Sequence, residues 1–202
     1  FNLDLMLNSE LKYRRDLCLI CCKKYLAYLN NPNISEIITN DNKKTIVLVN
    51  GEMRQSHLFI NWAKRISRIA YIYIFTDRKS YGKLNTKQKK LIEEYTTDIA
   101  FSEDDDFYTE ILNEKKECFR ITMHQWLKLR QATCKWGEEW QSKNVEAIFR
   151  MRTDVALLNP YLLENSIKNG FKGNISSGKI LARSDMFFAF HISDLKILSS
   201  FF

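Results

Sequence analysis

The chain has 202 residues and a mass of 24.0 kDa, the size of one domain or at most two small ones. Its 45% apolar and 27% charged residues are typical of a globular soluble protein, and only six glycines and two prolines exclude collagen-like and low-complexity sequences. The net charge of +7 favours anionic partners, and no apolar run approaches the roughly 20 residues that span a bilayer.

Residues 1–44 are predicted to be a separate N-terminal helical segment. Apolar side chains recur at helical spacing over residues 3–29, and the run Asn30-Asn31-Pro32-Asn33 ends the pattern. Three of the five cysteines, Cys18, Cys21 and Cys22, fall on this helix without a second ligand pair for zinc, so they are predicted to be buried apolar residues. Unpaired cysteines indicate a reducing compartment such as the cytoplasm, with peripheral membrane association left open.

Residues 45–202 alternate between buried strands and helices. Runs of β-branched and aromatic residues without polar alternation are typical of strands that are buried on both faces. This order predicts an α/β fold with a mostly parallel central sheet and helices on both faces, and it places ligands at the carboxyl ends of the strands. The predicted strands are 45–49, 69–75, 98–101, 145–154, 180–181 and 185–190, and the predicted helices are 53–66, 86–95, 108–140 and one that begins at Leu195.

The first strand ends in Asn50-Gly51-Glu52-Met53-Arg54. Gly51 allows a tight turn and a close approach of the backbone to a ligand, and the N-terminus of the next helix attracts anions. Arg54 is positioned to bind a phosphate through two hydrogen bonds. A single glycine does not make a P-loop or a dinucleotide fingerprint, so an ordinary strand-to-helix turn is the alternative.

The second strand ends in Asp77. A carboxylate at this edge can accept hydrogen bonds from a ribose or a base amine. It can equally cap the next helix or form a turn, and the sequence leaves both readings open. The stretch that follows is the densest in basic residues. It is either a solvated helix face or a cationic surface that binds phosphates or a membrane. No aromatic residue alternates with these lysines, which argues against nucleic-acid binding. Its members are Arg78, Lys79, Lys83, Lys87, Lys89 and Lys90.

Arg150, Arg152 and Asp154 follow one another at every second position of the fourth strand. Side chains at this spacing project to the same face of a sheet. Two arginines on an apolar face carry a large desolvation penalty unless they are paired or face a ligand. The arginines suit diphosphate oxygens, and the carboxylate suits a divalent cation or a sugar hydroxyl. An ion pair between Arg152 and Asp154 is the structural alternative.

Other acidic and histidine side chains give weaker signals. Asp185 precedes an apolar strand and is a candidate general base, with a strand-edge aspartate as the alternative. The acidic run 103–106 contains Asp104 and Asp106 at metal-ligand spacing, but runs of like charge are usually solvated loops. The three histidines share no motif.

Five stretches together resemble a group of small glycosyltransferases of capsule and lipopolysaccharide synthesis, including the WavE-like and related families. The resemblance covers about residues 45–202, and the Arg-x-Arg-x-Asp strand followed by Ser-Asp-x-Phe is its most specific part. The stretches are Ile46 to Arg54, Tyr73 to Asp77, Met123 to Lys128, Arg150 to Asp154 and Ser184 to Phe190.

The resemblance implies a GT-A-like, Rossmann-like fold and transfer of a sugar from a nucleotide-sugar donor to a glycan, lipid-linked glycan or protein acceptor. The resemblance implies that Asp154 corresponds to the last carboxylate of the Asp-x-Asp motif of these enzymes and would bind Mn²⁺ or Mg²⁺. Arg152 occupies the partner position here, so an arginine can replace the cation's charge. Asp185 would be the base. The nucleotide pocket would be lined by Gly51, Glu52, Arg54 and Asp77.

Two other function classes remain open. A nucleotidyltransferase-like enzyme would use the acidic loop at Asp104 and Asp106 to hold Mg²⁺, and a non-catalytic module for polyanions would rest on the charge of +7 alone. The chain begins at Phe1 and stops at Phe202 within an apolar pattern, so both ends are expected to be cut.

Overall fold

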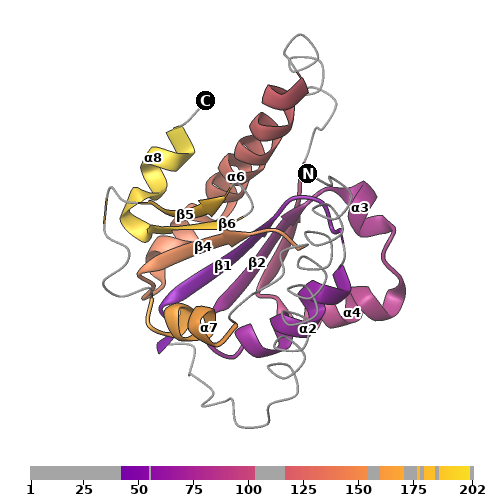
Figure 1. Cartoon of the computed structure of the whole chain (residues 1–202), viewed down its shortest axis with the longest axis horizontal. Coiled ribbons are helices and arrows are strands. Elements are labelled where there is room, and N and C mark those ends of the chain that lie inside the picture. The colour runs from indigo at the N-terminus through magenta and orange to yellow at the C-terminus, as the bar shows by residue number, and fades with distance from the viewer. Residues whose placement is uncertain are drawn as a thin grey trace, which may run out of the picture.

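The computed structural model of the chain describes residues 42–54, 56–102, 117–153, 160–170, 177, 180–184 and 187–200. Of the predicted N-terminal segment, only residues 42–44 fall within this part. The described residues contain one six-stranded sheet with the strand order β3-β2-β1-β4-β6-β5. Figure 1 shows this sheet in the middle of the molecule with helices on both of its faces.

Four neighbouring strands of the sheet run parallel. They are β1 (Thr45–Asn50), β2 (Tyr71–Thr76), β3 (Asp98–Phe101) and β4 (Ala147–Met151). Beyond β4, the strands β6 (Phe187–His191) and β5 (Ile180–Ser184) are antiparallel to their neighbours. Every residue of β1 and β4 is buried, which explains why both strands are mainly apolar in sequence and makes Asn50 and Arg150 exceptions.

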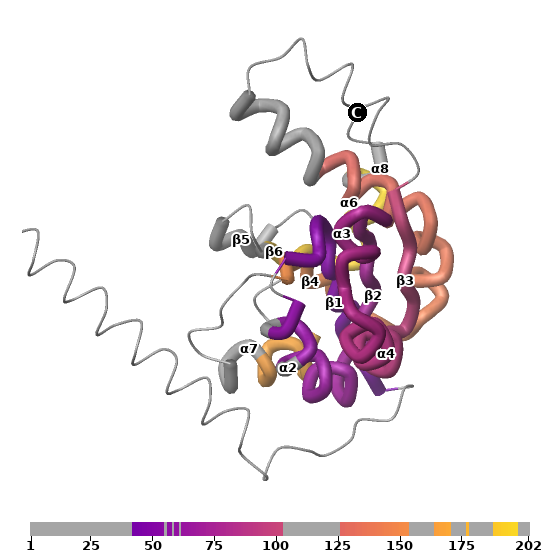
Figure 2. Tube along the Cα trace, turned by 90° about the vertical axis from the view of Figure 1, so that its right-hand side faces the viewer, coloured from indigo at the N-terminus to yellow at the C-terminus, as the bar shows by residue number. Residues whose placement is uncertain are grey.

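The helices form a layer on each face of the sheet. One face is covered by α2 (Ser56–Ile66), α4 (Thr86–Tyr95) and α7 (Pro160–Lys168), and the other by α6 (Glu117–Ser142) and α8 (Leu195–Ser200) (Figures 1 and 2). Two short helices, α3 (Arg78–Gly82) and η2 (Ile192–Asp194), complete the described helices, none of which is long and apolar enough to cross a membrane. The architecture is an α/β sandwich compatible with a Rossmann-like fold.

Alternate residues of β1 belong to the two different cores. Val47 and Val49 pack with Trp62 of α2, whereas Ile46 and Leu48 pack with the aromatic residues of α6. A strand of this kind needs apolar residues on both faces, so its position at the centre of the sheet follows from its sequence.

Most predicted elements are confirmed, with shifted ends. The helix 86–95 and the strand 98–101 have the bounds that the sequence predicts. The predicted strand 145–154 is shorter, at 147–151, and the helix predicted from Met53 begins only at Ser56. The backbone before α2 is used elsewhere, because the N–H of Met53 donates to Ser80 Oγ at 3.1 Å and the N–H of Arg54 donates to the carbonyl of Glu52 at 2.8 Å.

The sheet changes its winding direction between β1 and β4. From β1 the chain continues to β2 and then β3 on one side, and β4 is added on the opposite side of β1. In open α/β sheets, ligands bind in the crevice that such a switch point creates outside the carboxyl ends of the strands. The functional residues are therefore expected after β1 and after β4.

Candidate functional site

Gly51 begins the turn at the carboxyl end of β1. Its φ angle of 121° is one that residues with a side chain rarely adopt, and its N–H donates to the carbonyl of Phe75 at 3.1 Å. A Cβ built at this position would meet no other atom within 4 Å. The space beside the backbone of Gly51 is therefore open.

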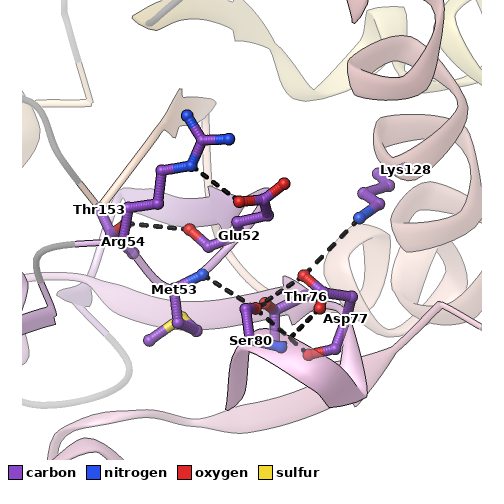
Figure 3. A network of polar contacts seen from close by, with 8 residues as sticks. All are labelled: Glu52, Met53, Arg54, Thr76, Asp77, Ser80, Lys128 and Thr153. Carbon is purple, nitrogen blue, oxygen red and sulfur yellow. Dashed lines mark hydrogen bonds and ion pairs between the residues drawn. The ribbon is translucent and has the colours of Figure 1, made fainter. Parts of the chain in front are cut away.

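The turn after β1 is joined to the end of β4 across the switch point. The hydroxyl of Thr153 donates to the backbone carbonyl of Glu52 at 3.1 Å, over a sequence separation of 101 residues (Figure 3). The Glu52 carboxylate pairs with Arg54 Nε at 2.7 Å, and both side chains are more than half exposed. An exposed pair of this kind contributes about 0–1 kcal/mol, so an incoming anion can displace Glu52 from the arginine.

Asp77 caps the helix that follows β2. Its carboxylate accepts hydrogen bonds from the backbone N–H of Ser80 at 2.6 Å and from Ser80 Oγ at 2.7 Å. Lys128 Nζ, from α6, lies 3.9 Å from the same carboxylate (Figure 3). Burial alone would raise the pKa of Asp77, but the hydrogen bonds from Ser80 and the charge of Lys128 outweigh it and lower the pKa below its usual value.

The sequence predicted two possible roles for Asp77, helix capping and ligand binding, and the structure contains the capping role. Asp77 is only 7% exposed and its oxygens already accept hydrogen bonds, so a direct role in binding a ribose or base would require these contacts to be exchanged.

The two arginines of the fourth strand have different surroundings. Arg150 is 1% exposed and lies on the face covered by α6, where its guanidinium carbon is 5.6 Å from the centre of the Phe188 ring. Arg152 follows the end of β4 and is half-buried at the rim. The sequence pattern predicts that both arginines lie on the same face of the strand. Arg150 lies within β4, but β4 ends at Met151, so Arg152 is outside the strand.

Two buried polar side chains at this edge have no hydrogen-bond partner among the described residues. Neither the amide nitrogen nor the amide oxygen of Asn50, at the end of β1, is hydrogen-bonded, although the residue is only 1% exposed. The hydroxyl of Ser102, immediately after β3, is also buried and unpartnered, while its backbone N–H donates to the carbonyl of Thr76 at 2.9 Å. Native proteins seldom leave buried polar groups unsatisfied, so each of these needs an explanation.

Several predicted site residues lie outside the described part of the chain. These include both carboxylates proposed for catalysis, so their predicted roles stay predictions. Among the residues that the structure describes, no three histidine, cysteine or acidic side chains are grouped to hold a metal ion. The residues outside are Asp154, Asp185, Asp104 and Asp106.

The structure adds residues that the sequence analysis did not select for this edge. Lys128 is half-buried between apolar neighbours on α6, and a lysine within an apolar stretch is the signal that could have identified it. The sequence around Ser80 and Thr153 does not indicate a role at this edge, because the role of a short hydroxyl side chain depends on its hydrogen-bond partner. Both of their partners come from other strand ends.

Comparison of the chain with models of known protein families gives no match. Comparison with curated protein sequences gives none either.

Proposed function

We propose that the chain is a glycosyltransferase that transfers a sugar from a nucleotide-sugar donor to a hydroxyl group of an acceptor. The observation that carries the proposal is the switch point between β1 and β4. There the Thr153–Glu52 hydrogen bond joins two turns that contain an open glycine backbone and two arginines, Arg54 and Arg152. A diphosphate suits this place, because it needs cationic partners and a backbone that it can approach closely.

The arginines would act on the leaving group. In the transfer, the acceptor oxygen forms a bond to the anomeric carbon, the bond from that carbon to the diphosphate oxygen breaks, and the electron pair remains on the diphosphate. Arg152 at the rim and Arg54, which is 60% exposed and paired with Glu52, would stabilise this developing charge. Arg150 would contribute from beneath, by holding the rim through its contact with Phe188.

The acceptor hydroxyl must also lose a proton. Asp185 is the residue proposed as the base and Asp154 as the carboxylate for a divalent cation; both proposals rest on the sequence resemblance. If Asp154 binds Mn²⁺ or Mg²⁺, the metal ion would stabilise the charge of the diphosphate. The effect of Arg152→Ala is therefore measured with and without each metal ion.

Arg152→Ala tests the proposal most directly. We expect the affinity for pyrophosphate, UDP and GDP to fall by about 10- to 100-fold, because a charged hydrogen-bonding group is removed. Isothermal titration measures the affinity, and release of nucleoside diphosphate from nucleotide-sugars with added acceptors measures the activity. Arg68→Ala, an exposed arginine remote in sequence from these strand ends, is the control. Unchanged nucleotide affinity in Arg152→Ala would count against the assignment.

A nucleotidyltransferase is the alternative within the enzymes. It would place its metal at Asp104 and Asp106 in place of Asp154. Loss of activity in Asp104→Asn with activity retained in Asp154→Asn would favour it.

A polyanion-binding module is the alternative outside the enzymes, and one surface supports it. Residues 78–92 contain no acidic residue, and most of their cations are exposed on α3, α4 and the loop between them. Contact with an anionic membrane surface is compatible with either function. Binding to nucleic acid that falls steeply with salt, without binding of any nucleotide-sugar, would favour the module. The exposed cations are Arg78, Lys79, Lys83, Lys87 and Lys90.

A further inference from the structure

We infer that the carboxyl edge contains a second subsite, on the face of the sheet covered by α6, and that Asn50 and Ser102 bind the nucleobase of the donor there. The inference rests on the proposed function, because it names the part of the donor that this face would take. It starts from the two side chains at this edge that are buried and unpartnered among the described residues.

The alternation along β1 gives the direction of the Asn50 side chain. Ile46 and Leu48 pack in the core beneath α6, so Asn50, two residues further, projects to the same face. Its neighbour across the sheet is Phe75, which belongs to that core. Ser102 lies one residue past the end of β3, but its N–H donates to the carbonyl of Thr76 at 2.9 Å and so continues the pairing with β2. The alternation from Ala100 then places Ser102 on this face.

The surroundings of this subsite are mainly aromatic, and the charged groups on this face are already engaged. The Arg150 guanidinium lies against the Phe188 ring, and Lys128 lies 3.9 Å from the Asp77 carboxylate. Phe75 contacts Trp136 of α6 with ring centres 6.0 Å apart, and Trp126 of α6 stacks on Phe188 with ring centres 5.5 Å apart. A phosphate or a sugar with many hydroxyl groups would lose more hydration here than the two polar groups could replace. A planar heterocycle fits better, since its faces are apolar and only its edge needs hydrogen bonds.

The chemistry of the asparagine amide narrows the ligand further. The amide offers one acceptor and one donor side by side, and a nucleobase edge offers the complementary pair. The Asp77 carboxylate is already engaged by Ser80 and Lys128, so it holds the neighbouring strand end in place while Asn50 and Ser102 keep their capacity for the base.

The division of labour between two subsites can be measured with two probes. Arg152 is assigned to the diphosphate, and Asn50 is assigned to the base. Asn50→Leu should lower the affinity for the best-bound of UDP, GDP, ADP and CDP about ten-fold or more, and it should leave the affinity for pyrophosphate unchanged. Arg152→Ala should lower both affinities. Ser102→Ala should lower only the nucleotide affinity, by about three-fold.

A second variant tests the edge of the base. Asn50→Asp replaces the donor by an acceptor. The carboxylate can accept two hydrogen bonds at once only from guanine, whose N1–H and N2–H are adjacent donors, whereas the edges of uracil, adenine and cytosine pair a donor with an acceptor. The loss of affinity in Asn50→Asp should therefore be smallest for GDP among the four nucleotides.

The unbound protein gives an independent measurement. Removing an unsatisfied buried amide should not destabilise the chain, so we expect Asn50→Leu to raise Tm by about 2–5 °C. Thr45→Val, at the other end of the same strand, is the matched control and should lower Tm without changing nucleotide affinity, because Thr45 Oγ1 donates to the carbonyl of Ile167 at 2.7 Å.

The outcomes separate this inference from the proposed function. If wild-type protein binds a nucleoside diphosphate more tightly than pyrophosphate and Asn50→Leu and Ser102→Ala bind it equally well, the base subsite is wrong and the glycosyltransferase proposal stands. If wild-type protein binds pyrophosphate as tightly as every nucleotide, no base is recognised and the subsite is overturned. If it binds neither, the proposed function fails and the subsite fails with it.

Discussion

Polar side chains are hydrogen-bonded differently at the two edges of the parallel strands, the edge of their amino ends and the edge of their carboxyl ends. At the amino ends, Thr45 donates to Ile167, Lys43 Nζ donates to the carbonyl of Ser67 at 3.0 Å, and the ammonium groups of Lys43 and Lys143 lie 5.0 and 4.6 Å from the centre of the Tyr71 ring. At the carboxyl ends, the side chain of Asn50 and the hydroxyl of Ser102, which follows β3, are buried without a hydrogen-bond partner among the described residues.

Two glycines show the same contrast in terms of space. Gly170, which follows α7, has a φ angle of 59°, and a Cβ there would lie 3.0 Å from both Lys44 Cβ and Glu146 Oε2. Gly51 at the carboxyl end also has a positive φ angle, but its surroundings are empty. The amino edge is packed and paired for stability. The carboxyl edge keeps space and hydrogen-bonding capacity, which is what a ligand site requires.

Gly170→Ala should have the largest effect on stability. The left-handed backbone and the two contacts at 3.0 Å together predict a loss of about 2–4 kcal/mol in the free energy of unfolding. Gly51→Ala should lose less, since only the backbone is strained, yet it should be the one of the two that weakens nucleotide binding. Urea unfolding and nucleotide titration of both variants measure this. Equal losses of stability would mean that the two edges are packed alike.

Thr45→Val should have the next largest effect. It removes one of two hydrogen bonds to the carbonyl of Ile167, which still accepts from the N–H of Gly170 at 3.1 Å, so the free energy of unfolding should fall by about 1–1.5 kcal/mol. Urea unfolding of Thr45→Val and of Asn50→Leu, which lies on the same strand, measures the difference in stability between the two edges. If Asn50→Leu destabilises the chain as much as Thr45→Val, then Asn50 has a structural role and the carboxyl edge is not special.

Asp77→Ala should have a smaller effect, and one that depends on pH. Removing the cap should cost about 1 kcal/mol at neutral pH. Because the pKa of Asp77 is lowered in the folded state, its stabilisation is fully present above the unfolded value of about 3.9 and is lost as the pH falls through the folded pKa. The difference between wild type and Asp77→Ala should therefore shrink below about pH 4. Thermal unfolding from pH 7 to pH 2 measures it, and a difference that does not change with pH would contradict the role of the charged carboxylate.

Glu52→Gln should have the smallest effect on stability, below about 0.5 kcal/mol, since the pair with Arg54 is exposed. Nucleotide affinity should rise slightly, because Arg54 no longer has to exchange a carboxylate for a phosphate. Lower nucleotide affinity in Glu52→Gln would show that Glu52 itself contacts the ligand. Chemical denaturation and titration on the same preparation test both statements.

The sequence determined the layers of this protein. Apolar runs such as residues 46–49 are unfavourable at a surface, so they are expected as central strands between two helical layers. The same pattern fixed the ends of those strands, and therefore the positions of Gly51 and Asp77 at one edge. Local chemistry was sufficient for this, since strand propensity and turn residues act over a few positions.

Only the tertiary structure decided what each polar residue at that edge does. Whether Asp77 caps a helix or stays available depended on Ser80 and on Lys128, which a distant helix brings to 3.9 Å. Arg150 and Arg152 are equivalent in a strand pattern. They differ because β4 ends at Met151, so Arg150 is buried beside Phe188 of the neighbouring strand and Arg152 lies beyond the sheet. The unpartnered state of Asn50 is a property of all its neighbours together, and hydrogen-bond satisfaction across separate strands cannot be read from the order of residues along one of them.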